Sequence, residues 1–86
     1  MQAKELTIKN PEGLRASRAA MFVQVAGGFT SQIFVEKGNK KINAKSIMGV
    51  LSLGAGRGDA IRVFISGVDE KEAAAAIMEL IEEKKA

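Results

Sequence analysis

The spacing of apolar residues changes repeatedly along this chain, and the order of those changes constrains the fold more than any other feature. Segments with the alternation, or the β-branched and aromatic content, of strands lie at residues 4–10, 29–37, 40–43 and 60–67. Helical spacing appears at residues 16–26, at 47–53 and after Asp69. The predicted order is therefore β-α-β-β-α-β-α. A two-layer α+β open-faced sandwich, with a four-stranded antiparallel sheet and three helices on one face, fits this order.

The breaks between these segments carry residues that favour turns or helix ends. They are Asn10-Pro11-Glu12-Gly13, Gly27-Gly28, the hairpin pair Gly38-Asn39, the helix N-cap Ser46, and Gly54. The expected core comprises Phe22 and Phe34, the inward strand positions Leu6, Ile8, Ile61, Val63 and Ile65, and the last-helix stripe Ala73, Ala74, Ile77, Leu80 and Ile81. Asp69 and Glu70 at the start of that helix, and Lys84-Lys85 near its end, are expected to complement its dipole.

The 86 residues suffice for one small domain spanning residues 1–86, with little room for a buried substrate cavity. The chain has no cysteine, which excludes disulfides and thiolate metal sites. It has no histidine, which excludes an imidazole base, a phosphohistidine and an imidazole metal ligand. We therefore expect no cofactor and no metal, and a small-molecule enzyme is disfavoured. Because no apolar stretch approaches the roughly 20 residues of a membrane span and none opens the chain, we expect a cytoplasmic protein.

The formal net charge of +3 is unevenly distributed. Residues 1–62 hold ten Lys or Arg against four Asp or Glu, whereas residues 63–86 hold three against six. A basic face could meet nucleic acid or an acidic protein surface. With only four aromatic residues, all Phe, a base-stacking platform is not expected, so direct nucleic-acid binding is the weakest hypothesis.

Two further patterns have ordinary explanations. The glycines at 54, 56 and 58 do not form a dinucleotide fingerprint, because a strand rather than a helix follows them, and they indicate a flexible turn. The acidic residues of the last helix are scattered along a solvated face, so they do not predict a metal site.

The stretch Glu12-Gly13-Leu14-Arg15-Ala16-Ser17-Arg18-Ala19-Ala20 runs from a glycine turn into a helix. A helix start presents unpaired N–H groups that favour anions, and Arg15 and Arg18 add donors for charge-assisted hydrogen bonds. The two arginines can equally be solvated side chains. However, cations at a helix start oppose its dipole, which is easier to explain if an anion or an acidic partner binds there.

Ser46 also has two interpretations. As an N-cap it accepts a backbone N–H from the first turn of its helix, and this role alone explains a serine. As a phosphorylation site it would place a phosphate where helix N–H groups and the dipole accommodate negative charge.

The motifs of this chain resemble the HPr family, the small phosphocarriers of the bacterial sugar phosphotransferase system, and their regulatory Crh relatives. The resemblance rests on "NAKSIMGVLSL" (residues 43–53), on Gly13-Leu14 with Ala16 and Ala19, on "FVEKGNKKINAKS" and on "DEKEA". The family's phosphocarrier motif reads G-L-H-A-R-P-A. Here Arg15 occupies the phosphohistidine position, Ser17 replaces the phosphate-holding arginine, and Arg18 replaces the proline. Arginine is permanently protonated and a weak nucleophile, so histidine-type phosphotransfer is excluded.

The resemblance implies a regulatory protein of carbon catabolite control rather than an enzyme. It implies that an HPr kinase/phosphorylase phosphorylates Ser46, that a LacI-type catabolite regulator binds the product as a corepressor, and that other phosphotransferase-system proteins are potential partners. The docking surface implied by the resemblance combines Arg15, Ala16, Ser17, Arg18, Ala20, Ile47, Met48 and Leu51. Ile47 and Leu51 could instead close the core, since they share one helix face. A constitutive docking module or decoy, independent of phosphorylation, is the alternative.

Overall fold

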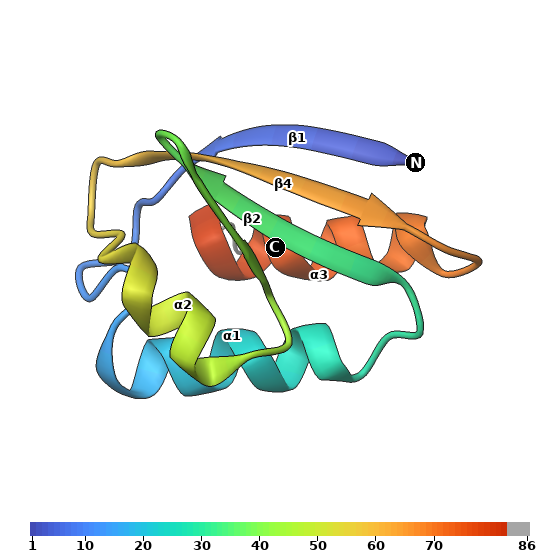
Figure 1. The fold of residues 1–86 in the computed structure, drawn as a ribbon, viewed down its shortest axis with the longest axis horizontal. Coiled ribbons are helices and arrows are strands. Elements are labelled where there is room, and N and C mark those ends of the chain that lie inside the picture. Colours follow the sequence, from blue (N-terminus) through green and yellow to red (C-terminus); the bar gives the residue numbers. More distant parts are fainter. Residues whose placement is uncertain (83–86) are drawn as a thin grey trace.

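The computed structural model describes residues 1–82 and shows one antiparallel sheet covered by helices (Figure 1). The elements follow the predicted order and are β1 (Gln2–Thr7), α1 (Ala16–Gly27), β2 (Gln32–Lys37), β3 (Lys40–Asn43), α2 (Ile47–Leu53), β4 (Ala60–Ser66) and α3 (Glu70–Glu82). The strand order across the sheet is β1-β4-β2-β3, so β3 is an edge strand as predicted. The α+β sandwich is confirmed. No helix within residues 1–82 is long and apolar enough to cross a membrane.

The sheet buries one face against the helices. Ile61, Val63 and Ile65 of β4 alternate inward with no more than 2% of their surface exposed, and Ile33 and Val35 of β2 lie beside them. Phe22 of α1 is fully buried among them, as predicted. Each helix thus packs one side against the core. The outer sides of α1 and α2 remain exposed to solvent.

The bounds predicted for two strands were wrong, and backbone hydrogen bonds to residues distant in sequence accompany the end of the first strand and the start of the second. The first strand begins at Gln2 rather than Lys4, and it ends at Thr7 rather than Asn10. Past its end the Lys9 N–H donates to Ile81 O of α3 at 3.1 Å instead of to a neighbouring strand. The second strand begins at Gln32 rather than at residue 29.

The carboxylate of Asp69 explains the late start of β2. It accepts the N–H groups of Thr30 at 2.8 Å and Ser31 at 3.0 Å, together with the Ser31 hydroxyl. These bonds hold the pKa of Asp69 at about 2, with the Ser31 hydroxyl as the largest cause. Asp69 therefore does more than complement the dipole of α3, because it holds a loop nearly 40 residues away in sequence.

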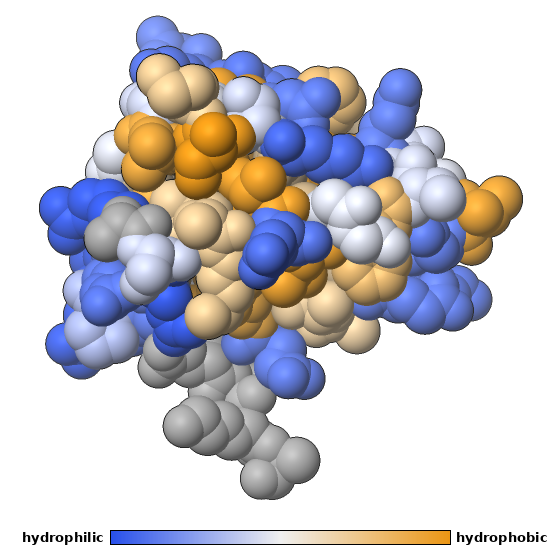
Figure 2. All heavy atoms as spheres, turned by 90° about the horizontal axis from the view of Figure 1, so that it is seen from below, coloured by the Kyte–Doolittle hydropathy of each residue, from blue (hydrophilic) through white to orange (hydrophobic). Residues whose placement is uncertain are grey.

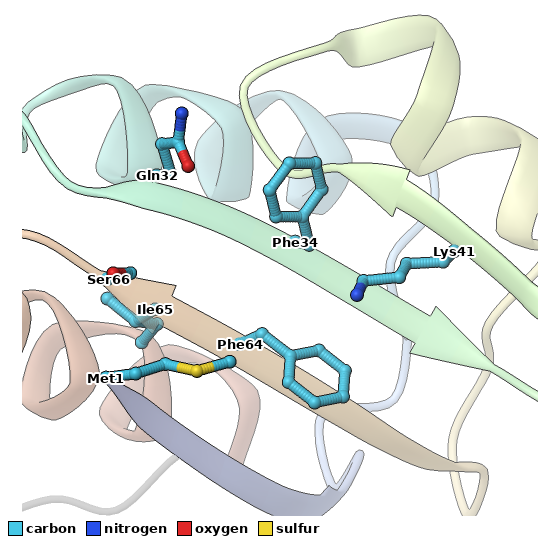
Figure 3. Close-up of a pocket in the computed structure, with 7 residues that line it drawn as sticks. All are labelled: Met1, Gln32, Phe34, Lys41, Phe64, Ile65 and Ser66. Carbon is cyan, nitrogen blue, oxygen red and sulfur yellow. The ribbon is translucent and has the colours of Figure 1, made fainter.

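Two core predictions were wrong in part. Phe34 is half-buried and lies on the sheet face opposite the helices, beside Phe64, rather than in the core (Figure 3). Strand alternation causes this, because Ile33 and Val35 on either side take the inward positions. Leu80 is half-buried at the margin of the α3 stripe, whereas Ala73, Ala74, Ile77 and Ile81 are buried as predicted. Lys84 and Lys85 lie outside the described residues.

Candidate functional site

The loop that leads into α1 is fixed by a close approach to the turn that follows α2. Gly13 has φ +64°, and a Cβ there would lie 2.6 Å from both Ala55 O and the Gly56 Cα. The N–H of the buried residue Leu14 donates to Ala55 O at 2.9 Å. Only glycine fits this approach without strain. A turn follows α2 as predicted, but it is not a free loop, because Ala55 is buried and the turn backbone supports the start of α1.

Arg15 is the N-cap residue of α1, with an extended backbone and an exposed side chain that does not cap the helix. Its Nε–H donates to Glu12 O at 3.4 Å, and the Ser17 hydroxyl donates to a carboxylate oxygen of Glu12 at 3.5 Å, both long bonds. The first turn of α1 contains no acidic residue. The start of the helix therefore presents a cation to solvent where anions are electrostatically favoured.

A carboxylate lies close enough to Arg15 to be affected by it. The pKa of Asp59 is lowered, first by the Gly56 N–H that donates to it at 2.8 Å and then by the Lys37 ammonium at 3.2 Å, with Arg15 contributing over a longer range. Asp59 is thus ionised at neutral pH and offsets part of the positive charge at this end of the molecule.

Ser46 caps α2 as predicted. Its Oγ accepts the Gly49 N–H at 3.1 Å, and its backbone is extended, with φ −108° and ψ 117°. The residue is exposed, so its hydroxyl is accessible from solvent. Gly54 ends the helix in the left-handed conformation, also as predicted. These caps fix the two ends of a helix of only seven residues.

The outer side of α2 is apolar and uncovered. Met48 is 73% exposed, Leu51 43% and Ile47 39%, and Met21 on the adjacent α1 is 42% exposed. We call these four residues the α1–α2 patch. Hydrophobic side chains gather over the two helices on this face (Figure 2). The hypothesis that Ile47 and Leu51 close the core is wrong, because Val50 and Leu53 are the buried residues of α2.

The structure places the remaining candidates of α1 around this patch. Ala20 and Ser17 are exposed, and Arg18 is half-buried with its Nη1–H directed to the Met21 sulfur at 3.5 Å. Ala16 lies in the first turn, and its side chain is not among those described. Met21 was missed from the sequence, although its position three residues after Arg18 places both on one helix face.

Within residues 1–82, no group of three or more His, Cys, Asp or Glu side chains is arranged to hold a metal ion. The groups that the structure places around the starts of α1 and α2 are an exposed hydroxyl, an apolar patch and flanking arginines.

Known proteins are similar to this chain in both sequence and fold. The family model for the PTS HPr component phosphorylation site matches residues 2–83. The HPr-like protein Crh of Halalkalibacterium halodurans is 49% identical over 84 residues, which cover 98% of this chain and all of that protein. The crystal structure of the phosphocarrier protein HPr from Bacillus anthracis matches with a TM-score of 0.91 at 41% identity, over 93% of this chain and 95% of that one. Crh of Bacillus subtilis, described as a dimer with a swapping domain, matches with a TM-score of 0.79 at 40% identity, over 100% and 99% of the two chains.

Proposed function

The chain belongs to the HPr family, as its motifs predicted, and on this basis we propose that it is a regulatory protein switched by phosphorylation of Ser46. In this proposal an HPr kinase/phosphorylase modifies Ser46, and the phosphorylated protein binds a LacI-type catabolite regulator as a corepressor in carbon catabolite control. The observation that carries the proposal is the exposed Ser46 hydroxyl at the head of a helix whose outer side is apolar and uncovered. The protein itself is not an enzyme in this scheme.

The position of Ser46 favours a phosphate chemically. A phosphoserine carries nearly two negative charges at neutral pH, and the start of a helix stabilises negative charge through its N–H groups and dipole. The phosphate would stand one residue before Ile47 and two before Met48. A partner would therefore meet a dianion and an apolar surface side by side, which offers both charge-assisted hydrogen bonds and buried area.

The chemistry at Arg15 supports the regulatory rather than the phosphocarrier role. The loop that holds Arg15 is positioned by Gly13 and Leu14, yet a guanidinium stands where the family's nucleophile belongs. Since the chain has no histidine, no imidazole can replace it. The protein is expected to remain unmodified when incubated with phosphoenolpyruvate and the general phosphotransfer enzyme, and labelling under those conditions would contradict this reasoning.

The direct test is incubation with ATP and an HPr kinase, followed by mass spectrometry of the intact protein. We expect a mass increase of one phosphate in the native protein and none in Ser46→Asn. Asparagine is the sharper control than alanine, because it caps a helix about as well as serine but accepts no phosphate. The absence of a mass increase in the native protein, or its persistence in Ser46→Asn, would refute the proposal.

A constitutive docking module or decoy is the second candidate, and one observation favours it: the α1–α2 patch is already exposed without any modification. The two functions differ in the dependence of binding on phosphate. If the regulator binds phosphorylated protein much more tightly than unmodified protein or Ser46→Asn, the switch is supported. Equal affinity for all three would favour the constitutive module.

A further inference from the structure

Two aromatic rings lie side by side on the sheet face opposite the helices. Phe64 of β4 stands directly opposite Phe34 of β2, and both side chains are half-buried. Directly opposed residues project from the same face of a sheet, here the face turned away from the helices. The rings border an open hollow of about 280 Å³, and Gln32 and Ser66, also directly opposed, border its other end (Figure 3). A hollow of this volume suits a ligand with one ring, since sites for larger ligands begin near about 300 Å³.

The ammonium group of Lys41 extends into this hollow from β3 (Figure 3). It lies 4.4 Å from the centroid of the Phe64 ring and 5.5 Å from that of Phe34, so cation–π contacts hold it in place. Glu36 stands directly opposite Lys41 on β2, but its carboxylate pairs with Arg62 Nη1 at 3.5 Å. Within residues 1–82, the Lys41 ammonium therefore has aromatic neighbours and no oxygen partner.

The neighbouring lysines differ from Lys41 in this respect. Lys40 and Lys45 each donate to a backbone carbonyl oxygen at 2.8 Å, and Lys37 pairs with a carboxylate oxygen of Asp59 at 3.2 Å. Their ammonium groups are thus engaged within the chain. The N–H donors of Lys41 remain available to a ligand in the hollow.

The hollow contains one positive charge that no carboxylate within residues 1–82 offsets. Met1 also borders it, but its α-amino group pairs with Glu70 Oε2 at 3.0 Å. One ammonium can balance a monoanion, whereas the charge of a phosphate is usually met by several N–H groups or by arginine. The apolar walls, formed by the two Phe rings and the Met1 side chain, favour a ligand that carries an apolar body next to its charge.

We propose that this hollow binds a small aromatic monocarboxylate. The carboxylate accepts hydrogen bonds from the Lys41 ammonium, and the ring of the ligand packs against Phe34 and Phe64, because aromatic rings favour one another in edge-to-face and offset arrangements. The Gln32 amide and the Ser66 hydroxyl lie at the far end of the hollow, where they can hydrogen-bond a polar substituent on the ring.

A nucleic-acid strand is the competing occupant, because paired aromatic side chains on an open sheet can stack bases. The sequence disfavoured such a platform in part because Phe34 was expected in the core, which is wrong. Charge still decides against it. The row of residues next to the rings runs across the sheet as Glu5, Arg62, Glu36 and Lys41, with two charges of each sign. A strand of phosphates needs a positively charged track, whereas a single monoanion needs only one ammonium.

Titration of the native protein with phenylacetate tests the proposal, followed by amide proton–nitrogen correlation NMR spectra. We expect saturable shifts at the amides of Gln32, Lys41 and Phe64, with a dissociation constant on the order of 1 mM. The amides of Ser46 and Met48 in α2 are internal controls and should not shift, so the result is independent of the function proposed for Ser46. Acetate at the same concentrations lacks the ring and is expected to give no saturable shift.

Two matched comparisons test the charge. Lys41→Gln is expected to weaken phenylacetate binding about three- to fivefold, as for an exposed ion pair. Lys71→Gln removes the same charge from an exposed position of α3 and should leave the dissociation constant unchanged. Phenylacetamide, the neutral counterpart of the probe, is expected to bind the native protein more weakly than phenylacetate does, and to bind native protein and Lys41→Gln equally.

The aromatic contact is tested with Phe64→Leu, which keeps an apolar side chain but removes the ring. Phenylacetate binding is expected to weaken about two- to tenfold. The same spectra show whether each variant is folded, and Lys41→Gln, at an exposed position, provides a test that does not depend on the stability of the Phe64 variant.

Several results would overturn the proposal. They are the absence of saturable shifts with phenylacetate, equally tight binding to Lys41→Gln and native protein, an equal loss of affinity in Lys71→Gln, and phenylacetamide binding as tight as that of phenylacetate. The final arm is an oligothymidylate of about eight nucleotides. Binding of this strand that is tighter than that of phenylacetate and that weakens steeply with salt would identify a nucleic-acid site instead.

Discussion

The hydroxyl of Ser46 is predicted to stabilise the fold independently of any phosphate. Its Oγ accepts the Gly49 N–H at 3.1 Å, and α2 carries the buried residues Val50 and Leu53, so the cap is coupled to the core. Ser46→Ala removes the acceptor and is expected to lower the free energy of unfolding by about 1 kcal/mol. In a domain of this size, that loss corresponds to a decrease in Tm of about 4–8 °C. Ser46→Asn retains an acceptor and is expected to remain within about 0.3 kcal/mol of the native protein.

Urea unfolding followed by far-ultraviolet circular dichroism measures these differences, with equal slopes against urea as the condition for comparing them. Ser52→Ala is the matched control in the same helix. The Ser52 hydroxyl donates to the Gly49 carbonyl at 2.7 Å, a bond within the helix that adds little stability, so alanine there is expected to be neutral or slightly stabilising. The reasoning is refuted if Ser46→Ala is as stable as the native protein, or if Ser46→Asn loses as much stability as Ser46→Ala.

Three further predictions concern the α1–α2 patch, the loop before α1 and the loop before β2. Met48→Ala is expected to weaken regulator binding by about tenfold without changing Tm, whereas Val68→Ala, at a 96% exposed side chain in the turn before α3, should change neither, as calorimetry can establish. Gly13→Ala is expected to lower the free energy of unfolding by at least about 2 kcal/mol in urea titrations, because it combines positive φ with a backbone clash at 2.6 Å. The depressed pKa of Asp69, about 2 against an ordinary 3.8, means that its stabilising contribution is complete above the ordinary value and is lost as pH falls through the folded value. Asp69→Asn should therefore flatten the decline of stability between about pH 4 and pH 2, and an unchanged pH profile would contradict this assignment.

The order of elements was predictable because it depends on local patterns. Local spacing shows both the type of each element and the side that faces the core. Examples are the alternation of Ile61, Val63 and Ile65 in β4 and the helical spacing of apolar residues in α1 and α3. The strand boundaries were not predictable in the same way. Whether β2 begins at residue 29 or 32 depends on the carboxylate of Asp69, which binds Thr30 and Ser31 across nearly 40 residues of sequence. No local pattern contains that information.

For the candidate site too, features set by residues close in sequence were predictable and features set by tertiary packing were not. The Ser46 cap was predictable, because its partner Gly49 is three residues away. The exposure of Ile47 and Leu51 was left open, because two residues on one helix face can point to the core or to solvent, and only the tertiary packing of Val50 and Leu53 decides between them. Phe34 stands between two other apolar residues, Ile33 and Val35, so the sequence does not show which of the three faces outward.

The replacement at Arg15 changes the chemistry of the α1 start while the constraints that shape it remain. Gly13 still approaches the Ala55 backbone, and Leu14 still anchors the loop, so the helix start is held by contacts that do not depend on the side chain at position 15. A partner that needs an imidazole nucleophile finds none, whereas a partner that recognises the relative placement of α1 and α2 finds a fold like that of the structural relatives. Under the proposed function, binding and phosphotransfer depend on different residues of one surface, so binding can persist without phosphotransfer. If the proposed function is right, a regulatory partner detects negative charge at Ser46 rather than chemistry at Arg15.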